Sequence, residues 1–461
     1  MKRISLALLC AACACAEVRL PAYTRYTLPN GLQVVLSQRR EIPMVTVRVV
    51  VRGGAEADPG ELFGLTAITA ELLRRGSATL DAGQFAAKVD ALGAELTIAA
   101  GRQSVTVGMD FLSKDQAAAL GLLSEAVLRP AFGQSEVEKA IAERIGAVNA
   151  AKDEPQELVR LYFRPFFFGL KHPYGHPDGG DDISLAALTR PAIVGQFQKL
   201  FCGRNSILVA VGDFDPAQMR AHIQKFFGSM PPGERLSWPE PRTGPPAKSP
   251  RLLLIDKPDA TQTYFLIGQP GIHRLHPDRT VLWLVNTLFG GRFTSMLNEE
   301  LRVNSGLTYG AASRVQLDRL PGAITISSFT KTGTTVQAID LALDVLNRLR
   351  NRGLTADQLK SVKAYVKGTY PTEALETNDQ VANLLGDLEL YGLGRGEIDD
   401  LFSRVDSVTL EQANAAARKY FQTSNLQFCL AGNAAAIRDA VRKYAPEAMR
   451  EIKSSAKGIR P

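Results

Sequence analysis

Histidine and cysteine are scarce in this chain of 461 residues, which has five of each. Cys10, Cys13 and Cys15 lie near the N-terminus, so only Cys202 and Cys429 remain in the body of the protein. Each of these two lies in or beside an apolar run typical of a strand, and we expect free buried thiols there, with a disulfide as the alternative. No cysteine or histidine spacing is that of a zinc finger.

Long apolar runs are absent as well, and no later stretch approaches the about 20 uninterrupted apolar residues of a membrane-spanning helix. The first residues place Lys2 and Arg3 before an apolar run and then small residues that end at Ala16, which is the order of a secretory signal. We expect residues 1–16 to be a signal peptide and the mature chain to be periplasmic or extracellular. A lipid-modified cysteine is the alternative.

The chain also lacks a strong charge of one sign. Its formal net charge is +7 and falls to about +5 (7 − 2) without the two cations of residues 1–16. No block of Lys and Arg is interleaved with aromatic residues, and no RNP-like motif occurs. The sequence therefore gives no support for nucleic-acid binding.

The sequence does contain a pattern of residues that is repeated on both sides of a proline-rich stretch. Residues 231–250 hold seven prolines and are interpreted as a linker. A lysine, an asparagine and a glycine around an apolar strand recur at an offset of 220 residues (432 − 212), with Gly212 and Gly432 as the last of each set. The predicted parts are an N-terminal module over 17–230, a related C-terminal module over 251–445 and a basic tail over 446–461.

The apolar periodicity predicts an α+β fold, because the strands come in hairpins rather than in β-α-β alternation. Valines from Val45 to Val51 alternate with Thr46, Arg48 and Arg52, as in a half-buried strand. A hairpin is expected around Ala100. The pattern predicts helices near 115–129, 135–152, 155–164, 277–301, 334–352, 355–368, 376–391 and 409–421, and strands near 206–212, 252–256, 261–268, 308–315 and 322–329.

One predicted helix has clear start and stop signals. Asp58-Pro-Gly-Glu61 indicates its beginning, with an acidic N-cap, proline at the first helical position and a glutamate placed for a capping box. Leucine and isoleucine follow at helical spacing as far as Leu72, and Gly76 ends the helix.

The run from Gly64 to Ser77, preceded by LQVVLSQ and VTVRVVVRGG, resembles the first zinc-site helix of the pitrilysin/insulinase family, which includes the mitochondrial processing peptidases. The resemblance extends from about Tyr26 to about Tyr444. It implies two homologous modules of mixed or antiparallel sheet covered by helices, a processing-peptidase-like fold that forms one half of a clamshell.

In that family the helix carries His-x-x-Glu-His, which provides two imidazole ligands and a carboxylate general base. Counting from Gly64 and Gly76 puts these positions at Ala67, Ala70 and Glu71. Alanine neither ligates a metal nor accepts a proton, and Glu71 is interpreted as a solvated helix residue. The motif is therefore degenerate, and His-x-x-Glu-His occurs nowhere in the chain.

The family's third ligand, a glutamate ahead of an Asp-x-Pro turn, is missing too. The turn is present as Asp153-Glu-Pro155, but counting back reaches Gly146 or Ala147, with Glu143 one helical turn earlier. Two carboxylates without a histidine are a poor ligand set for zinc, so we expect no metal on this chain.

The histidines at 172 and 176 lie in the sequence His-Pro-Tyr-Gly-His. The proline and glycine between them oppose a helix, so the two rings need not share a face. The family has a similar turn at this place, and we interpret it as structural.

The second module retains the strongest motif. Phe289-Gly-Gly leads into a helix that ends at Leu301-Arg302, and Gly-Leu-Thr-Tyr309 follows. This matches a segment of the family in which an arginine and a tyrosine lie seven positions apart. In paired-chain members, one chain can carry zinc while the other carries this Arg/Tyr pair. A surface arginine paired with Glu299 or Glu300, and a half-buried strand tyrosine, are the alternative interpretations.

The resemblance implies a non-catalytic, substrate-binding subunit of an exported two-chain zinc peptidase, inactive alone. Arg302 and Tyr309 would bind the substrate carbonyl or its oxyanion, and a related partner chain would supply zinc and the general base in a heterodimer. Peptides are the expected substrates. The alternatives are a peptide-binding or scaffolding protein that uses exposed strand edges, and a lone metalloprotease with unusual ligands.

Overall fold

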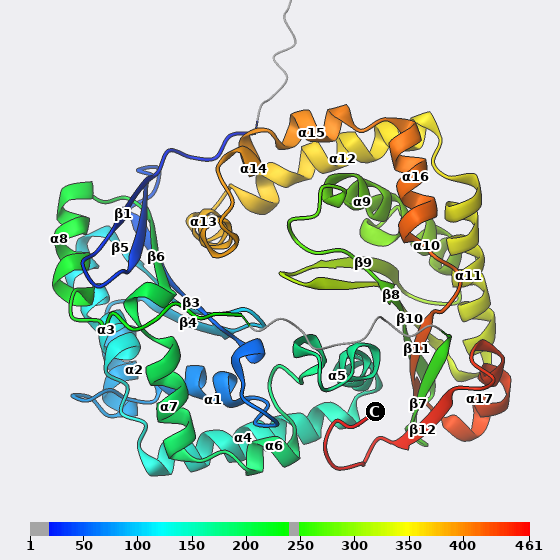
Figure 1. The fold of residues 1–461 in the computed structure, drawn as a ribbon, viewed down its shortest axis with the longest axis horizontal. Helices are drawn as coiled ribbons and strands as arrows, with labels where there is room; N and C mark the ends of the chain where they lie inside the picture. Colours follow the sequence, from blue (N-terminus) through cyan, green and yellow to red (C-terminus); the bar gives the residue numbers. More distant parts are fainter. Residues whose placement is uncertain (1–17, 239–248) are drawn as a thin grey trace, which may run out of the picture.

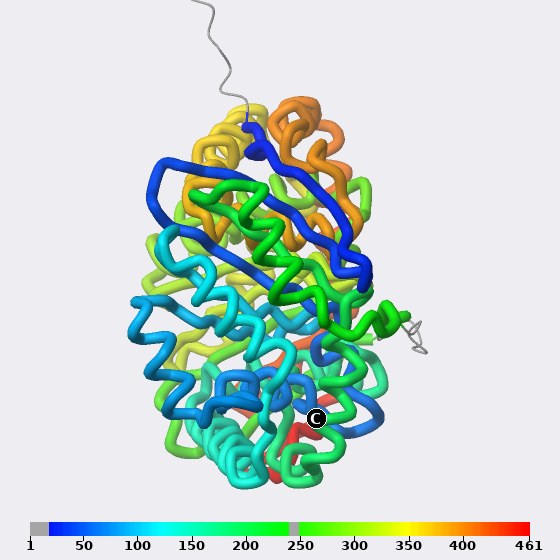
Figure 2. The backbone as a smooth tube through the Cα atoms, turned by 90° about the vertical axis from the view of Figure 1, so that its left-hand side faces the viewer, coloured from blue at the N-terminus to red at the C-terminus, as the bar shows by residue number. Residues whose placement is uncertain are grey.

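The computed structural model describes residues 18–238 and 249–461, which form two modules that each contain a six-stranded mixed sheet (Figure 1). Figure 2, turned by 90°, shows the first module in front of the second. The predicted signal peptide and residues 239–248 of the proline-rich linker lie outside the described residues. The α+β prediction with two related modules is confirmed.

The first module begins with the hairpin of β1 and β2 and ends with α8. Its strands are β1 (Thr24–Thr27), β2 (Gln33–Gln38), β3 (Met44–Arg52), β4 (Glu95–Ala100), β5 (Ser104–Leu112) and β6 (Ser206–Gly212). Its helices are α1 (Leu65–Glu71), α2 (Ala82–Ala91), α3 (Gln116–Leu128), α4 (Gln134–Asp153), α5 (Pro155–Phe168), α6 (Asp182–Ala186), α7 (Arg190–Leu200) and α8 (Pro216–Phe227).

The second module has its strands at both ends and between its helices. The strands are β7 (Arg251–Asp256), β8 (Gln262–Pro270), β9 (Ala311–Leu317), β10 (Pro321–Lys331), β11 (Gln427–Gly432) and β12 (Met449–Lys453). The helices are α9 (Arg279–Asn286), α10 (Met296–Asn298), α11 (Thr335–Arg352), α12 (Ala356–Ala374), α13 (Asn378–Tyr391), α14 (Gly396–Asp399), α15 (Leu401–Ser407), α16 (Leu410–Tyr420) and α17 (Ala434–Val441).

The two sheets share one topology, which explains the offset of 220 residues. The orders are β1-β2-β6-β3-β5-β4 and β12-β7-β11-β8-β10-β9. The repeated strands β6 and β11 occupy the same place: each is parallel to one neighbour, β2 or β7, and antiparallel to the other, β3 or β8. Only the outer strands β1 and β12 differ, because the two ends of the chain supply them.

Each module lends a helix to the sheet of the other. The aromatic side of α5 packs on the second sheet, where Phe163 lies so close to β8 that a Cβ at Gly268 would be 2.3 Å from its Cζ. In return, α13 packs on β3 and β6 of the first sheet, and a Cβ at Gly386 would be 3.0 Å from Val50 Cγ2. Two glycines thus permit the close approach.

The cover by α13 corrects the expectation of a half-buried strand at β3. Arg48 and Arg52 are 4% and 2% exposed, because α13 lies over the face that carries them. Arg48 Nη2 pairs with Asp110 at 2.7 Å and with Asp379 of α13 at 2.6 Å. Arg52 donates to the Glu389 carbonyl, also on α13, at 3.0 Å. The polar face is matched to a helix of the other module rather than to water.

The C-terminal residues form a strap between the modules, where a basic tail over 446–461 was expected. After β12 the chain turns back to the first module, and Figures 1 and 2 show the C-terminus beside it. The backbone N–H of Ile459 donates to Asp181 at 2.9 Å, and Tyr162 of α5 donates to the Gly458 carbonyl at 3.0 Å. The Ile459 side chain is fully buried against α5.

The helix expected from Asp58 begins later than its signals indicated. Residues 59–64 form turns, and α1 starts at Leu65 after Gly64, whose φ is +87°. Asp58 still binds the helix N-terminus, because its carboxylate accepts from the Gly64 and Thr66 N–H groups at 2.8 Å and from Thr66 Oγ1 at 2.6 Å. Burial nevertheless raises the pKa of Asp58 to about 7.

The single helix predicted near 277–301 is wrong, because it is interrupted. The helix α9 ends in a π-helical turn over Thr287–Gly291, and α10 leads into a second π-helical turn over Glu299–Asn304. The break occurs at a glycine packed against β9, since a Cβ at Gly290 would lie 2.3 Å from Ser313 N.

Two smaller expectations concern the thiols and the membrane. Cys202 and Cys429 are free and buried, which confirms the prediction of thiols rather than a disulfide. Within residues 18–238 and 249–461, every helix is too short or too polar to cross a bilayer.

The strap makes stability depend on the last residues of the chain. We expect Ile459→Ala to lower the free energy of unfolding by about 3 kcal/mol, because it empties a fully buried site. Urea unfolding followed by circular dichroism measures the change. Lys457→Ala, at an exposed strap position, is the control and should change it by less than about 0.5 kcal/mol. Equal effects of the two variants would show that the strap is not packed.

The raised pKa of Asp58 predicts a pH dependence of stability. Between its ordinary pKa of 3.8 and its folded value of about 7, the folded protein holds a proton that the unfolded chain has lost. The free energy of unfolding should therefore fall as pH rises across that window. In Asp58→Asn this fall of the unfolding free energy with pH should vanish. Asp90→Asn, at an exposed aspartate of α2, should show the same fall with pH as the wild type. Urea unfolding at a series of pH values measures the free energy of unfolding of each protein. Parallel plots of this free energy against pH for all three proteins would refute the raised pKa of Asp58.

Candidate functional site

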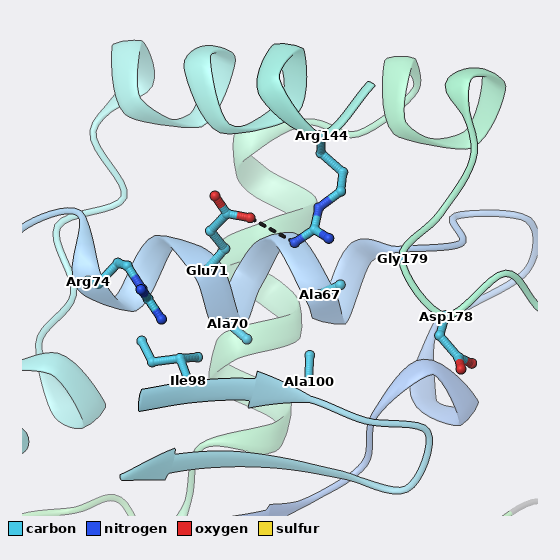
Figure 3. A pocket seen from close by; sticks show the side chains of 9 residues that line it. All are labelled: Ala67, Ala70, Glu71, Arg74, Ile98, Ala100, Arg144, Asp178 and Gly179. Carbon is cyan, nitrogen blue, oxygen red and sulfur yellow. Dashed lines mark hydrogen bonds and ion pairs between the residues drawn. The ribbon is translucent and has the colours of Figure 1, made fainter. Parts of the chain in front are cut away.

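The three positions of the degenerate zinc motif lie together on α1, facing β4 and α4. Ala67 and Ala70 are 7% and 1% exposed, and both line a cavity together with Ile98 and Ala100 of β4 (Figure 3). Glu71 lies on the side of α1 that faces α4. The sequence count from Gly64 and Gly76 therefore identified three neighbouring side chains.

A cavity of about 430 Å³ occupies the space beside the two alanines. Its floor is apolar, and its charged groups lie around the rim. The lining residues are Ala67, Ala70, Glu71, Arg74, Ile98, Ala100, Arg144, Asp178 and Gly179.

Glu71 is held by cations, which corrects its interpretation as a merely solvated helix residue. Arg75, one turn along, binds Glu71 Oε1 at 2.6 Å, and Arg144 of α4 binds Oε2 at 2.8 Å (Figure 3 shows the second pair). The side chain is 24% exposed. Both carboxylate oxygens are thus engaged by guanidinium groups, and neither is free to ligate a metal.

Glu143, the nearest carboxylate to the expected third-ligand position, belongs to the same ion-pair network. Its Oε2 lies 2.5 Å from Arg75 Nη2, and this pairing lowers the pKa of Glu143. Arg75 also lies 3.6 Å from Glu136. Over residues 18–238 and 249–461, three or more His, Cys, Asp or Glu side chains nowhere gather in a metal-binding arrangement. The residues present therefore do not fit a zinc ion.

The turn around His172 and His176 is structural, as interpreted. His172 Nδ1 accepts from the Tyr174 N–H at 2.9 Å, which closes the short helical turn Pro173–Gly175. The Tyr174 hydroxyl then accepts from the Leu320 N–H of the second module at 2.7 Å and from Gln103 Nε2 at 3.0 Å. Burial lowers the pKa of His172 to about 4. The turn thus fastens the modules to each other.

Arg302 and Tyr309 lie in the second module, across the molecule from α1 (Figure 1 shows α1 and α10 in opposite halves). Arg302 is part of the π-helical turn after α10, and its guanidinium lies 4.6 Å from the centre of the Phe293 ring. Tyr309 precedes β9 and is 81% exposed. Its ring is therefore not half-buried in a strand.

Arg302 does not form the ion pair that was the alternative interpretation. Glu300 pairs with Arg348 at 2.8 Å, and Arg302 forms no ion pair with any residue in the described ranges. The guanidinium rests on an aromatic ring that is itself 66% exposed, and Arg302 is half-buried. Exposed Val303 enlarges this surface to a mixed cationic and aromatic patch.

Sequence reasoning missed the residues that support these sites. Phe293 stands in the motif that led to Arg302, but its role under the guanidinium depends on the break after α9. Arg75 could have been paired with Glu71 from the i, i+4 spacing on one helix. Arg144 comes from another helix, 73 residues later (144 − 71), and no local pattern links it to α1.

Comparisons with known proteins agree with this geometry. The family model described as "Insulinase (Peptidase family M16)" matches residues 33–165, and the one described as "Peptidase M16 inactive domain" matches residues 187–366. The chain is 27% identical over 397 residues to an uncharacterized zinc protease of Mycobacterium leprae, in an alignment that covers 86% of this chain and 88% of that protein.

Two solved structures have the same fold. The peptidase M16 inactive domain from Pseudomonas fluorescens superposes with a TM-score of 0.82 at 25% identity, covering 89% of this chain and 98% of that one. The first half of the periplasmic protease PqqL from Escherichia coli gives 0.72 at 15% identity, covering 95% and 100%. The resemblance inferred from the helix at Gly64 and the segment around Arg302 is confirmed, and the chain belongs to peptidase family M16.

Proposed function

We propose that this protein is the non-catalytic, substrate-binding subunit of an exported zinc peptidase made of two related chains. Its two modules form one half of a clamshell that encloses a peptide. The partner chain carries zinc and the general base in a heterodimer. Arg302 and Tyr309 complete that site from this side.

The observation that carries the proposal is the contrast between the two modules. In the first, Ala67 and Ala70 stand at ligand positions and Glu71 is held by two arginines. In the second, Tyr309 is exposed and Arg302 is half-buried, and Arg302 has no carboxylate partner in the described part of the chain. A pair of groups that the fold leaves unused is available to a molecule outside this chain.

The chemistry of peptide hydrolysis gives such a pair a role. Attack on the scissile carbonyl develops negative charge on its oxygen, and a guanidinium and a phenol stabilise that charge by hydrogen bonds. The aromatic ring of Phe293 restricts the Arg302 side chain, which reduces the entropy lost on binding. When zinc is bound on the partner, it supplies the Lewis acid and activates water.

The proposed function includes export of the chain. It is supported by the expected signal at residues 1–16 and by the fold shared with a periplasmic protease. Detection of the mature chain in the periplasmic fraction, with an N-terminus after Ala16, would establish it.

The catalytic proposal predicts a strong effect of Arg302→Ala in the complex. The chain is mixed with a related chain from the same genome that has an intact His-x-x-Glu-His, and cleavage of a quenched fluorescent peptide is followed. We expect kcat/KM to fall about 100-fold, the usual loss on removing one oxyanion donor. Tyr309→Phe should cause a smaller loss of about tenfold.

Arg352→Ala, at an exposed arginine near the end of α11, is the matched control and should leave the rate unchanged. Co-elution on gel filtration verifies that each variant still associates. Full activity of the zinc-bearing chain alone, or equal rates for wild type and Arg302→Ala, would refute the proposal.

The distribution of zinc is a separate prediction. Elemental analysis of this chain purified alone should find far less than one zinc per molecule, because both oxygens of Glu71 are engaged by arginines. The complex should contain about one zinc, on the partner. Stoichiometric zinc in the isolated chain would instead favour a lone metalloprotease with unusual ligands.

A second candidate function is peptide binding or scaffolding without cleavage. It is favoured by the edge strands β4 and β9, each of which pairs with a neighbour on one side only. An extended peptide adds to such an edge through backbone hydrogen bonds. A stable complex with a partner or peptide but no zinc-dependent hydrolysis would identify this function.

A further inference from the structure

The cavity between α1 and β4 is a built site whose occupant the peptidase chemistry does not explain. Its floor is formed by methyl and methylene groups of Ala67, Ala70, Ile98 and Ala100 (Figure 3). Its volume of about 430 Å³ falls within the range of sites that bind small groups. The alanines therefore leave a space large enough for a ligand side chain.

The carboxylates at the rim of the cavity already have hydrogen-bond donors within the protein. Both oxygens of Glu71 are engaged by Arg75 and Arg144. Both oxygens of Asp178 accept from Arg164. The lining carboxylates are thus already neutralised by cations of the protein.

The two lining arginines are less used. Among the described residues Arg144 makes a single hydrogen bond, to Glu71, although a guanidinium has five donors. Arg74 is exposed and has no hydrogen bond or ion pair with any residue in 18–238 or 249–461. The rim consequently offers spare cationic donors and no spare carboxylate, which favours a ligand with negatively charged acceptors.

The neighbouring strand indicates how such a ligand would arrive. In the described part of the chain, the strand β4 is the edge of its sheet and pairs only with β5. Ile98 and Ala100 are two positions apart, so their side chains point to the same face of β4, toward the cavity. A peptide strand added to that edge would direct every second side chain to the same face.

We propose that this cavity binds a carboxylate of an extended peptide, with Arg74 and Arg144 as its cationic partners and the alanine floor accommodating its aliphatic part. The carboxylate is an acidic side chain or the peptide C-terminus. This binding needs no zinc and no partner chain, so it holds or fails independently of the proposed function.

The test measures binding of three fluorescein-labelled peptides to the full chain by fluorescence anisotropy. All three have the same sequence of Thr, Ser and Val residues around one central position. The first has Glu there and an amidated C-terminus, the second has Gln and a free C-terminus, and the third has Gln and an amidated C-terminus.

We expect the first or the second peptide to bind at least about tenfold more tightly than the third, and which one does so identifies the source of the carboxylate. Arg74→Gln and Arg144→Gln should each reduce that preference several-fold. Arg74 is exposed and unpaired, so its variant should unfold at the wild-type temperature. Arg40→Gln, at an exposed arginine of the same module, should keep the full preference.

Equal affinity for all three peptides would overturn the proposal, and so would the absence of binding by any of them. The proposal would also be overturned if Arg40→Gln reduced the preference for the carboxylate peptide as much as Arg74→Gln does. The attraction would then be a general effect of surface charge. Ala67→Leu provides a further check, because a larger side chain on the floor of the cavity reduces the space for the ligand. It should weaken binding of the acidic peptide and leave the affinity for the Gln-amide peptide unchanged.

Discussion

The exchange of α5 and α13 is the contact on which the arrangement of the molecule depends. Each helix buries its apolar side on the sheet of the other module, so neither sheet has a complete core without both halves of the chain. The Arg48 ion pairs with Asp110 and Asp379 add a charged contact at one of these interfaces. The two modules are therefore one packed unit, and the Arg302 surface is held in place relative to the cavity on α1.

Within that frame, the degenerate zinc site is stabilised by protein cations. A carboxylate at a partly buried position needs a positive charge nearby, and Glu71 obtains two from Arg75 and Arg144. Arg75 is shared with Glu143, so the two carboxylates closest to the family's ligand positions are bound to one guanidinium. The charge of both carboxylates is thus balanced by arginines of the chain itself.

Much of the fold followed from the sequence because its signals are local. The hairpin of β4 and β5, the long helices and the repeat around Gly212 and Gly432 each depend on neighbouring residues or on a fixed offset. The errors have different causes. The start of α1 is set locally, by turns that Asp58 bridges. The polar face of β3 is buried by α13, which follows more than 300 residues later in the chain. In the site, Ala67 and Ala70 could be located by counting, whereas Arg144 reaches Glu71 only in the folded chain.

The helix exchange also determines the order in which the chain can mature. The face of β3 and β6 that carries Val50 and Val209 is covered only when α13, over Asn378–Tyr391, has been made. The first module therefore cannot finish folding before α13 has been made, although its own strands and helices come first.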